Sequence, residues 1–151
     1  MQDECILHVE DDPNDVLLVR RAFEKAGIKT RIEVAEDGQK AINYLCDFEK
    51  HAPPRILLLD IKLPGKDGFE VLEWLRHQPA LRKLIVVFLT SSAIPGDITT
   101  AYDLGANSYC TKPVSPEELL DLAVNLKNWW FGPNLHAPLQ QDLASVGWYR
   151  A

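Results

Sequence analysis

Apolar positions along the first 130 residues fall into two alternating patterns. Five short runs have the length of strands, at residues 5–9, 32–35, 56–60, 84–89 and 108–111. The runs at 56–60 and 84–89 are almost continuously apolar, which is typical of parallel strands covered on both faces. Between the runs, apolar residues recur at the three- and four-residue spacing of amphipathic helices.

Capping and breaking residues delimit five predicted helices. The first follows Asp12 as N-cap and Pro13 as first helical residue, and Gly27 ends it. The others are predicted after Asp37 (with Ala41, Ile42, Leu45 and Phe48 on one face), from Gly68, over residues 97–104, and from Pro116 with Ser115 and Glu118 as a capping box. Alternating strands and helices predict the α/β class, a five-stranded, doubly wound parallel sheet with right-handed crossovers.

The length predicts one domain with a single core, since 151 residues are typical of that size. We assign residues 1–131 to this domain. Residues 132–151 form a short C-terminal extension, with no pattern long enough for a second domain.

Composition narrows the possible environments and partners. The net charge of −6 argues against a generic nucleic-acid binder, which usually carries a basic face. No run approaches the roughly 18–20 apolar residues needed to cross a bilayer, and the first residues lack the pattern of a signal peptide. Cys5, Cys46 and Cys110 suggest neither a disulfide framework nor a zinc site. We therefore expect a cytoplasmic protein without membrane or nucleic-acid partners.

Chemically active side chains fall at the carboxyl ends of the predicted strands. Glu10 and Asp11 follow the first strand, and Asp60 ends the third; Thr90 and Lys112 follow the fourth and fifth. Open α/β sheets bind their ligands at this edge. Crowded carboxylates need a counter-charge, and a divalent cation such as Mg²⁺ would supply it. A lysine and a hydroxyl beside the cation would complement a phosphoryl group, with Asp60 as the nucleophile.

Each of these residues also has an ordinary structural explanation. Glu10 and Asp11 can be a negative helix start, and Thr90 a hydroxyl bonded to the backbone. Lys112 can be a solvated surface charge, and Asp60 a loop cap. Their arrival at successive strand ends, in a consistent order, favours a shared site.

Five segments in order resemble the receiver domain of two-component response regulators. They are residues 9–12 (Val-Glu-Asp-Asp), 59–68 (Leu-Asp-Ile-Lys-Leu-Pro-Gly-Lys-Asp-Gly), 89–92 (Leu-Thr-Ser-Ser), 105–109 (Gly-Ala-Asn-Ser-Tyr) and 111–113 (Thr-Lys-Pro). The resemblance spans residues 5 to about 130 and implies the flavodoxin-like receiver fold.

The resemblance also implies a role for each site residue. Asp60 corresponds to the aspartate that a histidine kinase or a small phosphodonor phosphorylates, with slow self-catalysed dephosphorylation and no other enzymatic activity. Mg²⁺ (or Mn²⁺) would be held by Glu10, Asp11, Asp60 and the backbone carbonyl of Lys62. Thr90 and Tyr109 correspond to the switch residues and Lys112 to the phosphate-binding lysine. The Lys112–Pro113 peptide bond is expected to be cis.

Protein contact is the expected output. The last helix carries a core stripe (Leu119, Leu122, Ala123, Leu126 and Trp130) and a second apolar stripe (Leu120, Val124 and Phe131). The second stripe predicts a homodimer through the fourth helix, fifth strand and fifth helix; alternatively, the tail covers it, anchored by Trp148 and Tyr149. Residues 129–131 and the tail resemble stand-alone regulators paired with bacterial phytochromes, which implies a phytochrome-type sensor kinase.

Three other functions compete with that of a phosphorylated receiver. An aspartate-nucleophile phosphohydrolase would need a second Asp at position 62, where the chain has Lys62. A flavin or nucleotide binder would need a Ser/Thr/Gly-rich loop after the first strand, where three acids stand instead. A receiver-like interaction module that works without phosphorylation remains the open alternative.

Overall fold

The strands and helices alternate along the chain in the computed structural model, which describes residues 4–47, 50 and 52–137. Within these residues the elements are β1 (Cys5–Val9), α1 (Pro13–Lys25), β2 (Arg31–Ala35), α2 (Gly38–Cys46), β3 (Ile56–Leu59), α3 (Gly68–Arg76), β4 (Ile85–Thr90), α4 (Pro95–Asp103), β5 (Ser108–Thr111) and α5 (Pro116–Trp130). The predictions that involve Phe48, Trp148 and Tyr149 lie outside the described residues.

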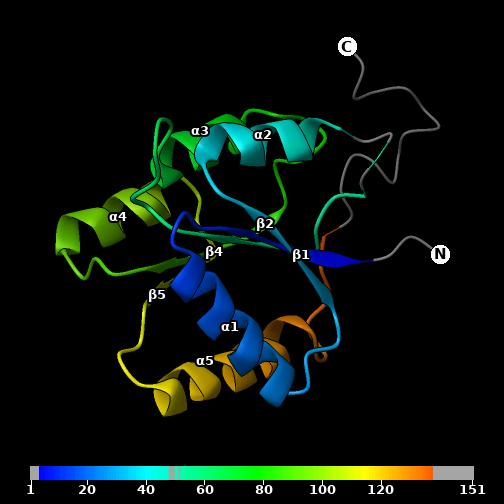
Figure 1. Ribbon diagram of the computed structural model, residues 1–151. Coiled ribbons are helices and arrows are strands. Elements are labelled where there is room, and N and C mark those ends of the chain that lie inside the picture. Colours follow the sequence, from blue (N-terminus) through cyan, green and yellow to red (C-terminus); the bar gives the residue numbers. More distant parts are fainter. Residues whose placement is uncertain (1–3, 48–49, 51, 138–151) are drawn as a thin grey trace.

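The sheet has the doubly wound topology that the alternation predicts. Its strands run in the order β2-β1-β3-β4-β5, and every neighbouring pair is parallel. Helices α1 and α5 cover one face, while α2, α3 and α4 lie on the other (Figure 1). The predicted fold class is confirmed.

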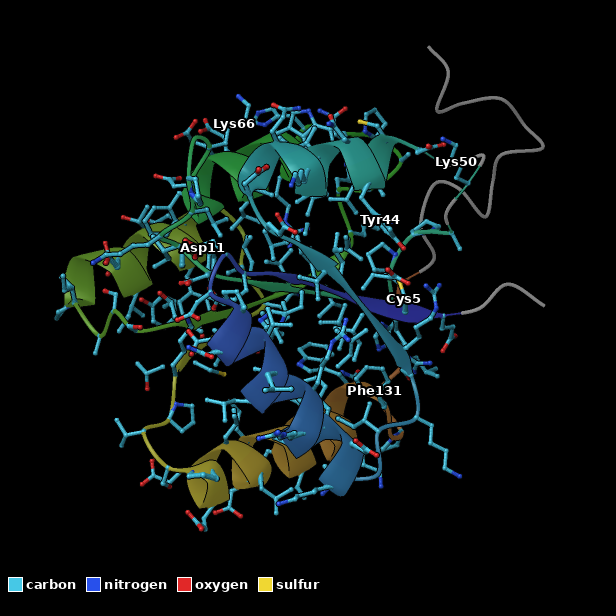
Figure 2. The ribbon with its side chains drawn as sticks, viewed as in Figure 1. Cys5, Asp11, Tyr44, Lys50, Lys66 and Phe131 are labelled. Atoms are coloured by element: carbon cyan, nitrogen blue, oxygen red, sulfur yellow. The ribbon has the colours of Figure 1, made fainter. Side chains whose placement is uncertain are left out.

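The core consists of two apolar layers, one on each face of the sheet (Figure 2). Leu57 and Phe88 point towards α2 and α3, while Leu58 and Val87 point towards α1 and α5. Strands β1 and β3 are buried at every position because helices cover both faces, whereas the edge strands β2 and β5 are partly exposed.

The second apolar stripe of α5 is only partly open to solvent. Val124 is exposed and Leu120 is half-buried, but Phe131 packs against the core layer beside α1 and α5. The Arg55 guanidinium also lies 5.1 Å from the centre of the Phe131 ring. Phe131 therefore serves the core, and the prediction that it extends an outward stripe is wrong.

Capping explains where the helices begin. The Asp12 carboxylate accepts a hydrogen bond from the Asn14 amide at 2.8 Å, as predicted for α1. At α5, Ser115 accepts from the Glu118 amide, but the described contacts do not include the return bond from the exposed Glu118 carboxylate. A capping box with both bonds occurs at α3 instead, between Asp67 and Glu70. None of the described helices has the length and apolar character needed to cross a membrane.

Gly68 holds the loop after β3 against the end of that strand. Its amide donates to the Ile61 carbonyl at 2.8 Å. A Cβ at position 68 would lie 2.1 Å from the carbonyl oxygen of Asp60, a distance that no real side chain tolerates. Glycine is therefore required for α3 to begin directly against Asp60.

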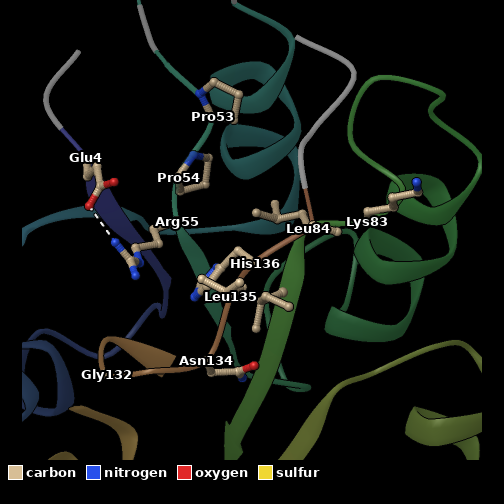
Figure 3. Close-up of a pocket in the computed structure, with 12 residues that line it drawn as sticks. Glu4, Pro53, Pro54, Arg55, Lys83, Leu84, Gly132, Asn134, Leu135 and His136 are labelled. Atoms are coloured by element: carbon tan, nitrogen blue, oxygen red, sulfur yellow. Dashed lines mark hydrogen bonds and ion pairs between the residues drawn. The ribbon is translucent and has the colours of Figure 1, made fainter. Parts of the chain in front are cut away.

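A cavity of about 330 Å³ opens at the amino-terminal edge of the sheet (Figure 3). It is lined by residues from the starts of β1, β3 and β4 and by residues 132 and 134–137 that follow α5. The Arg55 guanidinium donates to Glu4 Oε2 at 2.9 Å beside this cavity. None of the predicted site residues lines it, because they follow the opposite ends of the strands.

Candidate functional site

Backbone hydrogen bonds fix the two buried carboxylates at the carboxyl edge of the sheet. The Asp60 amide donates to the Val9 carbonyl at 3.2 Å, and the Glu10 amide donates to the Ala35 carbonyl at 3.0 Å. These bonds extend the parallel ladder one residue past β1 and β3. Glu10 is 1% exposed and Asp60 is 6% exposed, so both side chains are held in a largely water-free rim.

Lys112 joins the carboxylates from the end of β5. Its Nζ lies 2.5 Å from Glu10 Oε1, 2.8 Å from Asp15 Oδ2 and 2.9 Å from Asp60 Oδ2. Burial by itself would lower the pKa of Lys112, but its bonds to the three carboxylates outweigh burial and raise the pKa above its usual value. Lys112 is therefore a permanent cation at the centre of the site, and not the solvated surface charge of the structural explanation.

Glu10 is the titratable member of this group. Burial raises the pKa of its carboxyl to about 7, against the lowering influence of Lys112 and of the Asp12 amide, which donates to Oε2 at 3.2 Å. Burial therefore makes Glu10 take up a proton at a higher pH than an ordinary glutamate does. A metal ion bound to its oxygen would favour the ionised form.

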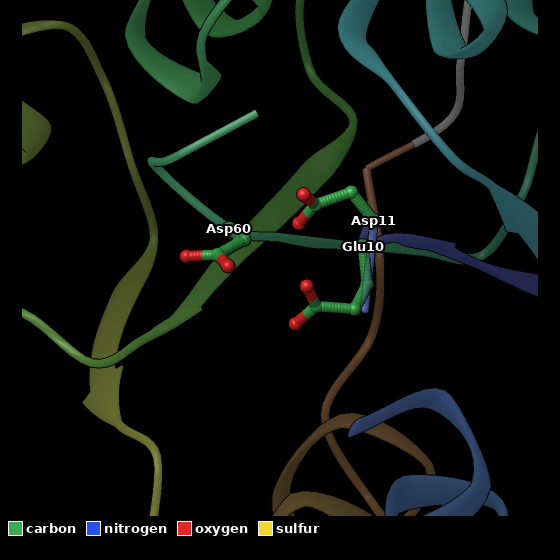
Figure 4. A group of neighbouring side chains, drawn as sticks. All are labelled: Glu10, Asp11 and Asp60. Carbon is green, nitrogen blue, oxygen red and sulfur yellow. The ribbon is translucent and has the colours of Figure 1, made fainter. Parts of the chain in front are cut away.

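Three carboxylates converge in a geometry that suits a divalent cation. Glu10, Asp11 and Asp60 each offer an oxygen within 4.8 Å of the other two (Figure 4). Two oxygens on opposite sides of Mg²⁺ lie about 4.2 Å apart, since each Mg–O distance is about 2.1 Å. Asp11 is exposed, so water has access to complete the coordination. The donor set and its spacing fit a hard cation; the Lys62 carbonyl as a further ligand stays a prediction.

The predicted switch residues lie on the neighbouring strands β4 and β5. Thr90 is 1% exposed at the end of β4, and its carbonyl accepts from the Lys112 amide at 2.7 Å. Tyr109 is half-buried on β5, and its hydroxyl donates to the Ser92 carbonyl at 2.8 Å. Burial raises the pKa of Tyr109, so its hydroxyl stays a donor at neutral pH.

No cis peptide bond occurs among the described residues, so the Lys112–Pro113 peptide bond is trans. The expected cis bond is therefore wrong for this structure. Before proline the trans form is favoured by about 0.5–1 kcal/mol. In the trans arrangement the Lys112 amine still contacts all three carboxylates.

Asp15 is the site residue that sequence reasoning missed. It lies in the first turn of α1 and accepts from Lys112 Nζ, which is 97 positions away in sequence. In the sequence it has the ordinary place of an acid near a helix N-terminus. The spacing of the acids could have indicated its role. Asp15 follows Asp11 and Asp12 by about one helical turn, which places it on the same rim.

His8 makes a pH-dependent contribution to stability that can be measured. Burial, followed by the charge of Lys112, lowers its pKa to about 4, and its Nδ1 has no hydrogen-bond partner among the described residues. Unfolding frees His8 to bind a proton between its unfolded pKa of about 6.5 and this lower value. The His8 contribution to the free energy of unfolding should therefore fall by about 3 kcal/mol as pH drops through that window.

The test compares urea unfolding of the wild type and His8→Leu from pH 7 to pH 4, with a chelator present. Glu10 acts in the opposite direction, because its raised pKa gives stability at low pH that is lost as pH rises towards 7. Subtracting the two curves removes this Glu10 contribution. His8→Leu should gain stability relative to the wild type on acidification, whereas parallel curves would show that His8 is not buried in its neutral form.

A parallel sheet with carboxylates, a hydroxyl and a lysine at its carboxyl edge is the arrangement of a receiver. Residues 6–124 match the response regulator receiver domain family, and the chain therefore belongs to this family. It is 41% identical over 131 residues to FilR2, a probable methanogenesis regulatory protein of Methanothrix harundinacea, covering 85% of this chain and 84% of that protein. It is 33% identical over 130 residues to response regulator Rcp1 of Synechocystis sp., covering 84% of this chain and 88% of that protein.

Solved structures agree with the sequence relatives. The Mn²⁺-bound form of Rcp1 superposes with a TM-score of 0.80 at 31% identity, over 89% of this chain and 99% of Rcp1. The phosphorylated cyanobacterial phytochrome response regulator RcpA superposes with a TM-score of 0.82 at 30% identity, over 88% of this chain and 97% of RcpA. The chain is thus a response regulator, a signalling protein of two-component phosphorelays.

Proposed function

We propose that Asp60 accepts a phosphoryl group from a sensor histidine kinase in a Mg²⁺-dependent reaction. The observation that carries the proposal is the position of Asp60. Its carboxylate lies 2.9 Å from the Lys112 amine and also belongs to the cluster of oxygens that suits a metal ion. A nucleophile between two positive charges can approach a phosphoryl group without the repulsion that its own charge would otherwise cause.

The chain's residues divide the work of the transfer. An Asp60 oxygen attacks phosphorus, the bond from phosphorus to the donor's nitrogen or oxygen breaks, and the donor leaves with that electron pair. The Ile61 amide donates to Asp60 Oδ1 at 2.8 Å and orients the carboxylate. Lys112 then binds a phosphoryl oxygen, and the Thr90 hydroxyl turns towards another. Mg²⁺ held by Glu10, Asp11, Asp60 and the Lys62 carbonyl would neutralise charge on the phosphoryl oxygens.

Signalling follows from the change of charge at Asp60. The acyl phosphate adds strong acceptor oxygens, and these favour the arrangement in which Thr90 contacts them. Tyr109 reports this movement on the outer face, because it bonds to the loop that follows Thr90. Slow attack of water on the acyl phosphate returns the protein to its starting state, so no other enzymatic activity is assigned.

The surface beside Asp60 supports a protein as phosphodonor. Leu17 and Leu18 on α1 are 46% and 41% exposed, and Leu18 lines a shallow groove that continues to Lys112 and Pro113. Because Lys112 contacts Asp60, exposed leucines on the helix that borders this groove suit a partner helix that brings a phosphodonor to the site. The similarity to RcpA supports a phytochrome-type kinase as the partner, and we propose a cytoplasmic location for the protein. The net charge of −6 supports a protein partner over nucleic acid.

The test is phosphorylation by acetyl phosphate, followed by intact mass. With Mg²⁺ present, the protein should gain the mass of one phosphoryl group, and a chelator should prevent the gain. Hydroxylamine should then remove it, because hydroxylamine cleaves acyl phosphates and leaves phosphoserine intact. A protein that takes up no phosphate from acetyl phosphate or a histidine kinase would instead be the phosphorylation-independent interaction module.

We also propose that residues 1–131 form the receiver domain and residues 132–151 its tail. We further propose that the protein forms a homodimer through α4, β5 and α5. Three exposed side chains support this face: Ile94, Tyr102 and Val124, which are 63%, 49% and 36% exposed. Val124→Glu should raise the dimer dissociation constant about tenfold or more, since it would bury a charge in an apolar contact. Light scattering across a concentration series measures this, with Leu17→Glu on α1 as the matched control. A wild type that is monomeric at every concentration contradicts the dimer and favours the tail as the cover.

A further inference from the structure

We propose that Gly38, the first residue of α2, positions the loop that carries the Lys62 carbonyl and thereby sets the affinity of the site for Mg²⁺. The inference rests on the proposed metal site. Gly38 has no side chain with which to reach a metal ion or a phosphoryl group. It is therefore a positioning residue, which acts through the loop between β3 and α3, residues 60–67.

The backbone of Lys66 lies directly against Gly38. A Cβ added at position 38 would lie 2.3 Å from the Lys66 carbonyl oxygen and 3.0 Å from the carbonyl carbon. Both are backbone atoms, so a side chain at position 38 has to displace the loop itself. The exposed amine of Lys66 takes no part in this contact. Gly38 is buried, although residues 36, 39 and 40 around it are exposed, because the loop covers it.

Backbone conformation does not explain the glycine at position 38. Its φ is not positive, unlike that of Gly65, so alanine can adopt the same conformation. Alanine is also the more stable residue within a helix. Asp37 already caps α2, since its carboxylate accepts from the Lys40 amide at 2.7 Å. Space for the Lys66 backbone is therefore the property that glycine supplies here.

Both ends of the loop are fixed, so a displacement at Lys66 spreads towards Lys62. The Gly68 amide donates to the Ile61 carbonyl at 2.8 Å and closes the loop. Helix α3 cannot move towards the strand to make room, because Gly68 already lies against the Asp60 carbonyl. The Lys62 carbonyl stands between these two fixed points, so it takes up part of the displacement.

A purely structural role for Gly38 predicts a different result. Gly65 has a φ of +69°, and a Cβ there would meet no atom within 4 Å, so it is the residue at which the loop bends most easily. If the displacement stops at Gly65, Lys62 keeps its place and Gly38 serves only the packing of α2. Loss of packing lowers the stability of the fold but leaves metal binding by the folded protein unchanged. The affinity for Mg²⁺ therefore separates the two explanations.

The experiment is a calorimetric titration of the full chain with Mg²⁺, without a phosphodonor. Gly38→Ala should weaken binding about tenfold, as loss of a residue that supports a metal ligand does elsewhere. Phosphorylation by acetyl phosphate should need about tenfold more Mg²⁺ for half its maximal rate, yet approach the wild-type rate at saturation. The loop is exposed at residues 64–66 and can move outwards, so the fold should persist, and circular dichroism verifies this.

Gly96→Ala is the matched control. Gly96 also lies in the first turn of a helix and has no positive φ, but a Cβ there would meet no atom within 4 Å. This variant should bind Mg²⁺ as tightly as the wild type. The two glycines thus differ in the space around them, which is the property under test.

Backbone amide signals of nitrogen-15-labelled, metal-free protein measure the displacement directly. Gly38→Ala should shift the signals of residues 62–66, and Gly96→Ala should leave them in place. Unchanged Mg²⁺ affinity in Gly38→Ala, equal weakening in Gly96→Ala, or loop shifts confined to residues 65 and 66 would overturn the inference. A wild type that binds Mg²⁺ but takes up no phosphoryl group contradicts the proposed function alone, whereas one that binds no Mg²⁺ overturns both.

Discussion

Asp60→Asn should abolish phosphoryl uptake completely. An amide is a poor nucleophile and carries no charge for Lys112 or a metal ion to bind, so the reaction loses both its attacking atom and part of its cation site. Asparagine is nearly isosteric with aspartate. Its side-chain oxygen can still accept the hydrogen bond that the Ile61 backbone amide donates to Asp60 Oδ1 in the wild type. The fold should therefore persist. Intact mass after incubation with acetyl phosphate and Mg²⁺ measures uptake, and circular dichroism verifies folding.

Asp12→Asn is the matched control for Asp60→Asn. Asp12 belongs to the same acidic rim but is exposed and caps α1, a position that Asn fills almost equally well. This variant should keep wild-type uptake. Full phosphorylation of Asp60→Asn, or loss of uptake in Asp12→Asn, would contradict the assignment of Asp60 as the phosphoryl acceptor.

Lys112→Met should slow phosphorylation at least about hundredfold. Lys112 bonds to Asp60 and is positioned to bind the incoming phosphoryl oxygens, and removal of one such preorganised donor costs about two orders of magnitude in rate in other active sites. The variant also leaves Glu10 and Asp60 buried without their cation. Unfolding should become easier by about 3 kcal/mol or less, because Glu10 can take up a proton in compensation.

The affinity for Mg²⁺ should increase in Lys112→Met, although the phosphorylation rate falls. Loss of a positive charge beside three carboxylates removes repulsion towards Mg²⁺, so Lys112→Met should bind Mg²⁺ more tightly than the wild type and regain stability when Mg²⁺ is added. Calorimetric titration and thermal unfolding with and without Mg²⁺ measure both effects. Lys66→Met, which removes an exposed lysine from the loop before α3, should leave the rate and the affinity unchanged. Weaker Mg²⁺ binding in Lys112→Met would contradict this account of the charges.

The predicted fold agrees with the structure because its signals are local. Apolar runs such as Ile56–Leu59 follow from burial on both faces of a strand, and Pro13 and Gly27 mark helix ends through their own backbone preferences. The edge at which Glu10, Asp60 and Lys112 meet also follows from the sequence, because parallel strands present their carboxyl ends on one side.

Predictions failed where a contact depends on partners far apart in the chain. Phe131 has the spacing of an outward residue on α5, but it is the C-cap of that helix and packs against the core beneath Arg55. Asp15 was not predicted as a site residue, because its contact with Lys112 joins two residues that are 97 positions apart in the sequence. One further failure was local instead: Glu118 was expected to complete a capping box with Ser115, three residues before it, yet its exposed carboxylate makes no described return bond.

The sequence by itself determined the order of strands and helices, the edge that carries the chemistry, and the resemblance to receivers. Tertiary structure alone decided the charge balance at Lys112, the raised pKa of Glu10 and the contact between Gly38 and the Lys66 backbone. The physical reason is that local backbone preference and apolar periodicity act between neighbouring residues. Burial, ion pairing and side-chain hydrogen bonds instead depend on distances that exist only after the sheet has brought separate strand ends together.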